Sequence, residues 1–130
     1  MIYGRIPRHI DLDRLVNSIG GNKTKKEYIR NGIVYIISRI HNEQLKWFQK
    51  QEGKNYDKYV ILNYKTLENI IGKGEWDRVS LIKKILLDND IIESDGTYYS
   101  KSKSYGYRIK REHISDDLVS VNRQHKVDKI

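Results

Sequence analysis

The spacing of apolar residues predicts two helices in the first part of the chain. Residues 11–19 carry an apolar face at helical spacing, with Asp11 as the N-cap and Gly20-Gly21 as the end. The sequence Thr24-Lys25-Lys26-Glu27 matches a capping box, in which the threonine hydroxyl and the glutamate carboxylate bond to exposed backbone amides. A long helix is therefore expected over residues 25–51.

The long helix carries two adjacent apolar rows, which make a face wider than a single packing partner requires. The rows consist of Ile29, Ile33, Ile36, Ile40 and Trp47, and of Val34, Ile37, His41, Leu45 and Phe48. One row is expected to pack on the domain that follows. The other is expected to meet either the N-terminal helix or a second copy of the chain, which would be a homodimer through residues 25–51. Gly32, in mid-helix, indicates either a close backbone approach or a tolerated solvent-side position.

The central part of the chain predicts a strand followed by two helices. Tyr59-Val60-Ile61-Leu62 is β-branched and apolar and too short for a helix. Asn63 is a suitable N-cap for a helix over residues 64–71, and Lys73-Gly74-Glu75 is the expected turn. A second helix is expected over residues 76–89. Its inward face consists of Val79, Ile82, Ile85 and Leu86.

Short β-branched and aromatic runs predict further strands over residues 91–109. Ile91-Ile92-Glu93-Ser94 is the first of them, and Asp95-Gly96 favours a tight turn directly after it. Residues 97–99 and 105–109 form two more runs, separated by a loop rich in serine and lysine.

This order of elements resembles the winged helix-turn-helix family from the long helix through Arg111. The most specific stretch is Leu86-Leu87-Asp88-Asn89-Asp90-Ile91-Ile92, because many winged helices end their second helix with a leucine, a polar turn and two apolar residues. The family usually has Gly where this chain has Asp90, a residue that tolerates a left-handed backbone better than most. Lys103-Ser104-Tyr105-Gly106-Tyr107-Arg108 is similar to the return strand in winged domains of phage and plasmid replication or regulatory proteins.

The resemblance implies an α+β, mainly helical fold. Its winged helix-turn-helix core would span residues 59–111, with the long helix and a short N-terminal helix before it, in a single domain over residues 1–112. Residues 113–130 are expected to form a mobile extension with one or two helical turns near Ile114.

The chain is basic and contains no cysteine. With a formal charge of +8 and a pI near 9.6, its first expected partner is a polyanion, since basic surfaces gain affinity by displacing counterions from phosphates. The absence of cysteine excludes disulfides and thiolate metal sites. No apolar run approaches the roughly 18–20 residues that cross a bilayer. Residues 1–5 lack a secretory signal, so a cytoplasmic protein without a membrane partner is expected.

Duplex DNA is the expected partner, because helix-turn-helix proteins place their second helix in the major groove with its N-terminal part against base edges. Ser80 and Lys84 are expected to donate to bases, whereas Arg78 and Lys83 flank them and would reach phosphates. The outward set of this helix is Asp77, Arg78, Ser80, Leu81, Lys83 and Lys84. The loop and return strand contain no acid between residues 101 and 111 and are expected to contact the DNA backbone. The phosphate-contact set is Lys65, Lys73, Lys101, Ser102, Lys103, Ser104, Tyr105, Arg108, Lys110 and Arg111.

The predicted function is therefore non-enzymatic DNA binding in replication initiation or transcriptional regulation. The alternative is a winged helix used for protein–protein contact or assembly, because one fold serves many functions. The weakly basic outward face of the second helix and the second apolar row of the long helix favour this alternative. No enzyme, metal site, cofactor or small-molecule substrate is expected, because the four histidines lack HxH or HExxH spacing and no GxxxxGK[ST] loop is present.

Overall fold

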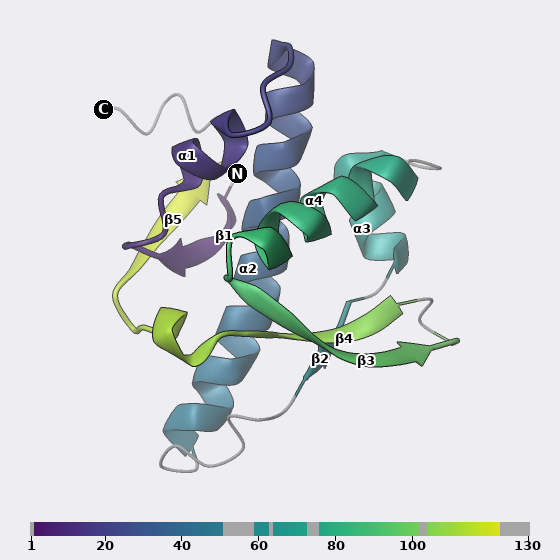
Figure 1. The fold of residues 1–130 in the computed structure, drawn as a ribbon. Helices are drawn as coiled ribbons and strands as arrows, with labels where there is room; N and C mark the ends of the chain where they lie inside the picture. Colours follow the sequence, from purple (N-terminus) through teal and green to yellow (C-terminus); the bar gives the residue numbers. More distant parts are fainter. Residues whose placement is uncertain (1, 51–58, 63, 73–75, 102–103, 123–130) are drawn as a thin grey trace.

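A long central helix, α2 (Lys23–Lys50), organises the computed structural model, and both sheets and the other three helices contact it (Figure 1). The structure describes residues 2–50, 59–62, 64–72, 76–101 and 104–122. In chain order the elements are β1 (Ile2–Pro7), α1 (Leu12–Asn17), α2, β2 (Val60–Ile61), α3 (Tyr64–Ile71), α4 (Trp76–Asp88), β3 (Ile92–Tyr99), β4 (Ser104–Ile109), the 3₁₀ turn η1 (Arg111–His113) and β5 (Leu118–Asn122). Helices and two small antiparallel sheets confirm the α+β, mainly helical class.

The helix starts follow local capping chemistry. Asp11 caps α1 as predicted, because its carboxylate accepts a hydrogen bond of 3.1 Å from the backbone N–H of Arg14. At the start of α2 the side chain of Asn22 accepts from the N–H of Lys25 at 2.9 Å. The predicted capping box at Thr24 was therefore wrong: Asn22, a favoured N-cap residue two positions earlier, begins the helix instead.

The first apolar row of α2 packs against α3 and α4. Its four described side chains, Ile29, Ile33, Ile36 and Ile40, are fully buried. Gly32 lies at the closest approach: a Cβ added there would be 2.4 Å from Cδ1 of Ile82 and 3.2 Å from Cδ1 of Ile71. Of the two interpretations of Gly32, the close backbone approach is the one that the structure confirms.

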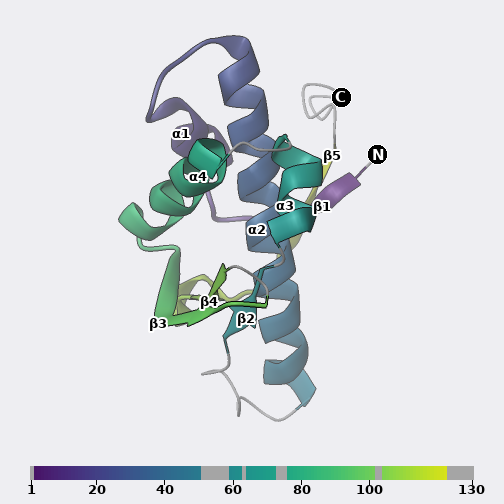
Figure 2. The ribbon, with the colours of Figure 1, turned by 90° about the vertical axis from the view of Figure 1, so that its right-hand side faces the viewer.

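The second apolar row of α2 packs against a ribbon that the sequence did not predict. β1 and β5 pair antiparallel, with Arg5 opposite Ser120 and Ile6 opposite Val119. The ribbon lies on the side of α2 away from α4 (Figure 2), and the N–H of Arg5 donates to Oγ of Ser38 at 3.2 Å. Val34 of this row is fully buried beneath Gly4. Val34, Ile37 and His41 of this row are thus buried within the chain, whereas Leu45 is half-buried and the side chain of Phe48 lies outside the described part.

The β1–β5 ribbon also corrects the expectation for the C-terminal part. The chain turns briefly through η1 and then forms an extended strand from Leu118, so the helical turns predicted near Ile114 were wrong. Pairing with β1 brings residues 118–122 into the fold instead of leaving them in an extension from residue 113. Residues 123–130 lie outside the described part of the chain.

The second sheet has the strand order β2–β4–β3. Asp90 adopts a left-handed φ of 57° between α4 and this sheet, as the sequence predicted. The prediction of a tight turn between two strands at Asp95-Gly96 was wrong, because β3 continues through these residues to Tyr99. The register shifts between Ser94 and Tyr98, so Asp95-Gly96 forms a bulge within the strand, with φ 76° at Gly96. The hairpin connection instead follows Tyr99, which pairs with Ser104.

A buried amide fixes this sheet to α2. The side chain of Gln44 is fully buried, where Oε1 accepts from the backbone N–H of Ile109 and Nε2 donates to its carbonyl at 3.4 Å. Gln44 thereby supplies the two hydrogen bonds that a neighbouring strand would give.

Candidate nucleic-acid interface

The helix α4 presents the outward face that its periodicity predicts. Val79, Ile82, Ile85 and Leu86 are buried. Asp77, Ser80 and Lys84 are exposed on the opposite side. Leu81 is half-buried and packs against the core, so it belongs less to this face than the sequence suggested.

The two cations predicted to flank this face contact the protein itself. Nη1 of Arg78 donates to the carbonyl of Ile71 at 3.2 Å, and the guanidinium lies 4.4 Å from the ring centre of Tyr28. Arg78 therefore joins α4 to α3 and α2. Nζ of Lys83 lies 5.0 Å from the ring centre of Tyr107, and burial lowers the pKa of its ammonium group.

The contact between Lys83 and Tyr107 places α4 beside the β3–β4 hairpin. Tyr107 lies in β4 and is buried, and burial raises the pKa of its hydroxyl. The hairpin follows α4 after a short turn, and the two elements lie next to each other in front of α2 in the view of Figure 1. The predicted recognition helix and the predicted wing therefore share one side of the molecule.

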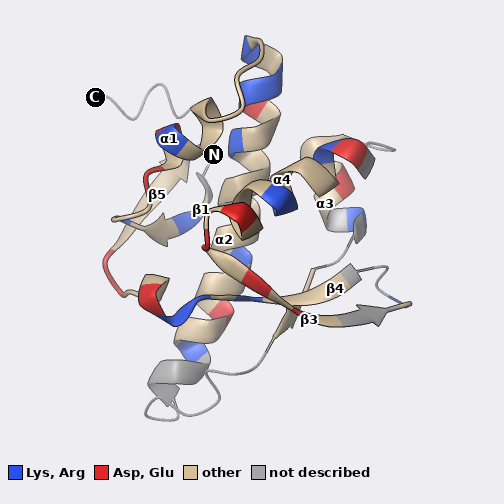
Figure 3. Cartoon of the chain, in the orientation of Figure 1, with Lys and Arg blue, Asp and Glu red and all other residues tan. Residues whose placement is uncertain are grey.

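Acidic residues neutralise the cations at the base of the hairpin. Arg108 forms an ion pair with Glu93, its cross-strand neighbour, and its guanidinium lies 4.7 Å from the ring centre of Tyr59. Nζ of Lys110 lies 3.1 Å from Oδ1 of Asp90, and this hydrogen bond raises the pKa of Lys110. Figure 3 shows acidic and basic residues interspersed along α4 and an acidic residue at the start of β3. The sequence segment 101–111 contains no acid, but the neighbouring strand supplies one.

The remaining predicted contact residues fall into two groups. Lys65, Lys101, Tyr105 and Arg111 have exposed side chains. Lys73, Ser102 and Lys103 lie outside the described residues, and for Ser104 the structure describes the backbone in β4 alone. Nζ of Lys84 on α4 lies 2.8 Å from Oδ2 of Asp88, one turn further along the helix.

Most of the net positive charge of the chain lies outside the predicted winged helix-turn-helix core, residues 59–111. Residues 59–111 contain ten Lys and Arg against seven Asp and Glu, which gives +3 of the chain's +8. Residues 1–58 contain twelve basic and six acidic residues, which gives +6. Three of these basic residues, Lys23, Lys25 and Lys26, lie in the first turn of α2. The charge that favours a polyanion is therefore spread over two regions.

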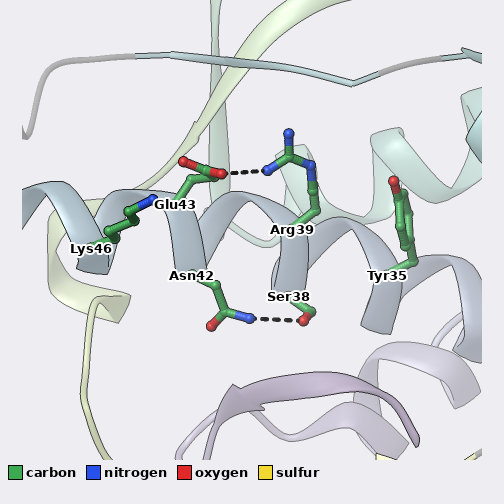
Figure 4. A pocket seen from close by; sticks show the side chains of 6 residues that line it. All are labelled: Tyr35, Ser38, Arg39, Asn42, Glu43 and Lys46. Atoms are coloured by element: carbon green, nitrogen blue, oxygen red, sulfur yellow. Dashed lines mark hydrogen bonds and ion pairs between the residues drawn. The ribbon is translucent and has the colours of Figure 1, made fainter. Parts of the chain in front are cut away.

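A separate hollow of about 340 Å³ lies along α2 (Figure 4). It is lined by Tyr35, Ser38, Arg39, Asn42, Glu43 and Lys46. Nη1 of Arg39 pairs with Oε1 of Glu43 at 2.9 Å, and Nδ2 of Asn42 donates to Oγ of Ser38 at 3.1 Å. These polar groups bond to one another, and none belongs to the predicted contact sets.

Other kinds of site find no support in the described part of the chain. No three histidine, aspartate or glutamate side chains within it are grouped to hold a metal ion. None of its helices combines the length and the apolar character needed to span a membrane. Comparisons with known proteins found no matching family model, no matching curated protein and no matching solved structure.

Proposed function

We propose that this chain is a winged helix-turn-helix protein that binds duplex DNA without catalysis. In this proposal α4 enters the major groove and the β3–β4 hairpin follows the phosphate backbone. The proposal includes a role in replication initiation or transcriptional regulation. This part rests on the similarity of residues 103–108 to the return strand in winged domains of phage and plasmid replication or regulatory proteins.

The observation that carries the proposal is the placement of α4 against the hairpin. Lys83 of α4 lies over the ring of Tyr107 in β4, so a duplex that meets the outward face of α4 would also meet the hairpin. A helix on base edges and a neighbouring segment on the backbone are the two kinds of contact that DNA recognition needs.

The contact residues in this proposal are cations and donors with exposed side chains. Ser80 and Lys84 are exposed on α4 and can donate to base edges or phosphates. Lys101 and Arg111 are the exposed cations at the two ends of the hairpin segment. The pair between Lys84 and Asp88 is an exposed i,i+4 contact, a kind that contributes about 0.3–0.5 kcal/mol, so a phosphate can replace Asp88 as the partner at little cost.

The alternative function, a winged helix for protein–protein contact, is favoured by the acids at the base of the hairpin. Glu93 and Asp90 neutralise Arg108 and Lys110, and the predicted core carries a net charge of only +3. A surface of mixed sign suits a protein partner better than a polyanion.

A DNA titration separates the two functions. Fluorescence anisotropy with a labelled random duplex at low salt should show binding in the micromolar range, and the logarithm of the affinity should fall linearly with that of salt concentration. Lys84→Ala and Lys101→Ala should each reduce the salt slope by about 0.9, the contribution of one phosphate contact. Arg5→Ala removes the same charge from an exposed residue of β1, across α2 from α4, and should leave the slope unchanged.

Two results would decide against DNA binding. Absence of binding up to about 10⁻⁴ M at low salt, the weak end of the usual non-specific range, would leave the protein–protein function. Equal effects of all three substitutions would mean that net charge attracts the DNA and that α4 and the hairpin do not contact it.

A further inference from the structure

Two histidines join distant parts of the chain at the end of the β1–β5 ribbon. His9 follows β1 and His113 ends η1, and Nε2 of His9 lies 3.0 Å from Nδ1 of His113 across 104 residues of sequence. Their rings are nearly parallel, at 10°, with centres 5.3 Å apart. A hydrogen bond between two ring nitrogens requires that one of them be unprotonated. The contact therefore breaks when both rings carry a full complement of protons.

A third histidine holds the next residues of the same segment. His41 of α2 is fully buried, and its Nε2 accepts a hydrogen bond of 3.0 Å from the backbone N–H of Ser115. Since Nε2 accepts, the ring proton is on Nδ1, which is buried without a hydrogen-bond partner among the described residues. Protonation of His41 would remove the acceptor of Ser115 and bury a charge.

The surroundings of His41 and His113 favour the neutral form of each ring. Burial lowers the pKa of His41, and burial followed by the charge of His9 lowers the pKa of His113. The charged groups facing the cluster are Glu112, whose Oε1 is 3.7 Å from Nε2 of His113; Lys110 with its partner Asp90; and the Arg8–Asp117 ion pair next to His9 in sequence. Glu112 and the backbone of Asp90 favour the protonated form of His113, but burial outweighs them.

The segment that these histidines hold leads directly into β5. The N–H of Arg8 donates to the carbonyl of Asp117 at 2.9 Å, and Leu118 then pairs with Pro7. The ribbon that follows covers the second apolar row of α2. Release of this segment would therefore loosen the ribbon at one end.

We propose that His9, His41 and His113 form an acid-sensitive lock: protonation of these rings on acidification releases residues 113–115, loosens the β1–β5 ribbon and uncovers the apolar side of α2 at Val34 and Ile37. The lock does not depend on DNA binding, because the ribbon that it loosens, β1 with β5, contains none of the predicted DNA-contact residues.

Amide hydrogen exchange of the full chain at pH 7.5 and 5.0 tests the lock, with rates corrected for intrinsic exchange. The decisive variant is His9→Gln with His113→Asn. The glutamine amide takes the place of Nε2 and the asparagine amide that of Nδ1, so the contact is kept without a titrating group. His125→Asn, which changes a histidine outside the described residues, controls for the loss of one imidazole.

In the wild type, protection of β1 and β5 should fall by about an order of magnitude between the two pH values, while α4 changes less. In the double variant the fall should be smaller than in the wild type, because His41 is then the one histidine of the three that still titrates, and His125→Asn should behave as the wild type. Parallel loss of protection in ribbon and α4, no loss at all, or a double variant as acid-sensitive as the wild type would overturn the lock. If the double variant does not fold, wild-type imidazole titrations decide: coupled titration of His9 and His113 supports the lock, whereas independent titration of the two rings refutes it.

Discussion

Replacing Gln44 by Met tests how the β2–β4–β3 sheet is fixed to α2. The buried amide of Gln44 serves both backbone groups of Ile109, and Met has nearly the same length and volume without a hydrogen-bonding group. Gln44→Met therefore removes both bonds without opening a cavity. Loss of a hydrogen bond to a buried backbone group costs about 1–3 kcal/mol, and the more apolar Met side chain offsets part of this loss. We expect the free energy of unfolding to fall by about 2–4 kcal/mol.

Urea denaturation followed by circular dichroism measures this loss. For a slope of about 2 kcal/mol per molar urea, the midpoint should fall by about 1–2 M while the slope stays the same. Asn42→Met is the matched control, because Asn42 is an exposed amide two residues earlier on the same helix that bonds to the Ser38 hydroxyl and not to the sheet, and it should unfold within about 1 kcal/mol of the wild type. Equal midpoints for the two variants would refute the argument that the Gln44 amide holds the sheet.

Three further predictions concern stability. Gly32→Ala should destabilise the protein by about 1–3 kcal/mol in urea denaturation, because the clash with Ile82 exceeds the gain of about 1 kcal/mol in helix propensity; a more stable variant would contradict the close packing. Asp90→Ala should unfold about 1–2 kcal/mol more easily than Asp90→Gly, since both lose the carboxylate and only Gly accepts φ 57° freely; equal stabilities would exclude backbone strain at this site. Because burial lowers the pKa of His41 in the folded protein, the unfolded chain binds more protons at mildly acidic pH. The contribution of neutral His41 to the unfolding free energy is therefore complete above pH 6.5 and is lost as the pH falls toward the native pKa. Equal unfolding free energies at pH 7.5 and 5.5 would contradict this.

The elements that the sequence predicted correctly are those specified by nearby residues. Helix α3 has the predicted bounds, and α4 ends one residue before the predicted end. Asp11 caps α1 through a bond to Arg14, three residues away. Capping and apolar periodicity act within a few residues, and a single sequence contains all the information they need.

The β1–β5 ribbon could not be predicted in the same way. Its strands pair across more than a hundred residues, with Arg5 opposite Ser120, and neither strand carries a strong signal of its own. Gly4 and Pro7 interrupt the alternation in β1. The covered apolar row of α2 did indicate that a partner was needed, but the pattern on one helix does not identify what covers it.

The bulge in β3 was missed because pairing overrode a local turn signal. Asp95-Gly96 is a favourable turn dipeptide. In the structure the pairing of Tyr98 with Tyr105 carries β3 past it, and the Asp95 carboxylate lies beside Gly106, where no side chain occupies the space. Pairing with β4 thus determines that Asp95-Gly96 forms a bulge and not a turn.

In the candidate site, too, local features were predicted correctly and those that depend on strand pairing were not. The outward face of α4 follows from periodicity alone, and Ser80 and Lys84 are exposed as predicted. The charge of the hairpin does not follow from its own segment, because the register places Glu93 opposite Arg108. A count of basic residues along the sequence therefore overestimated the cationic character of the wing.

The burial of each ion pair decides how much of that cationic character DNA can still use. The side chains of Lys84 and Asp88 are 71% and 59% exposed, so water already weakens their attraction and a phosphate can compete for the lysine. Those of Arg108 and Glu93 are 19% and 34% exposed, and removing Arg108 from its partner would leave a partly buried carboxylate uncompensated. Among the described residues, phosphate contacts should therefore come from Lys65, Lys84, Lys101 and Arg111, which corresponds to a salt slope of about −4. If the measured slope is much steeper, substitution of Lys23, Lys25 and Lys26 tests whether the first turn of α2 also contacts DNA, because it should then reduce the slope.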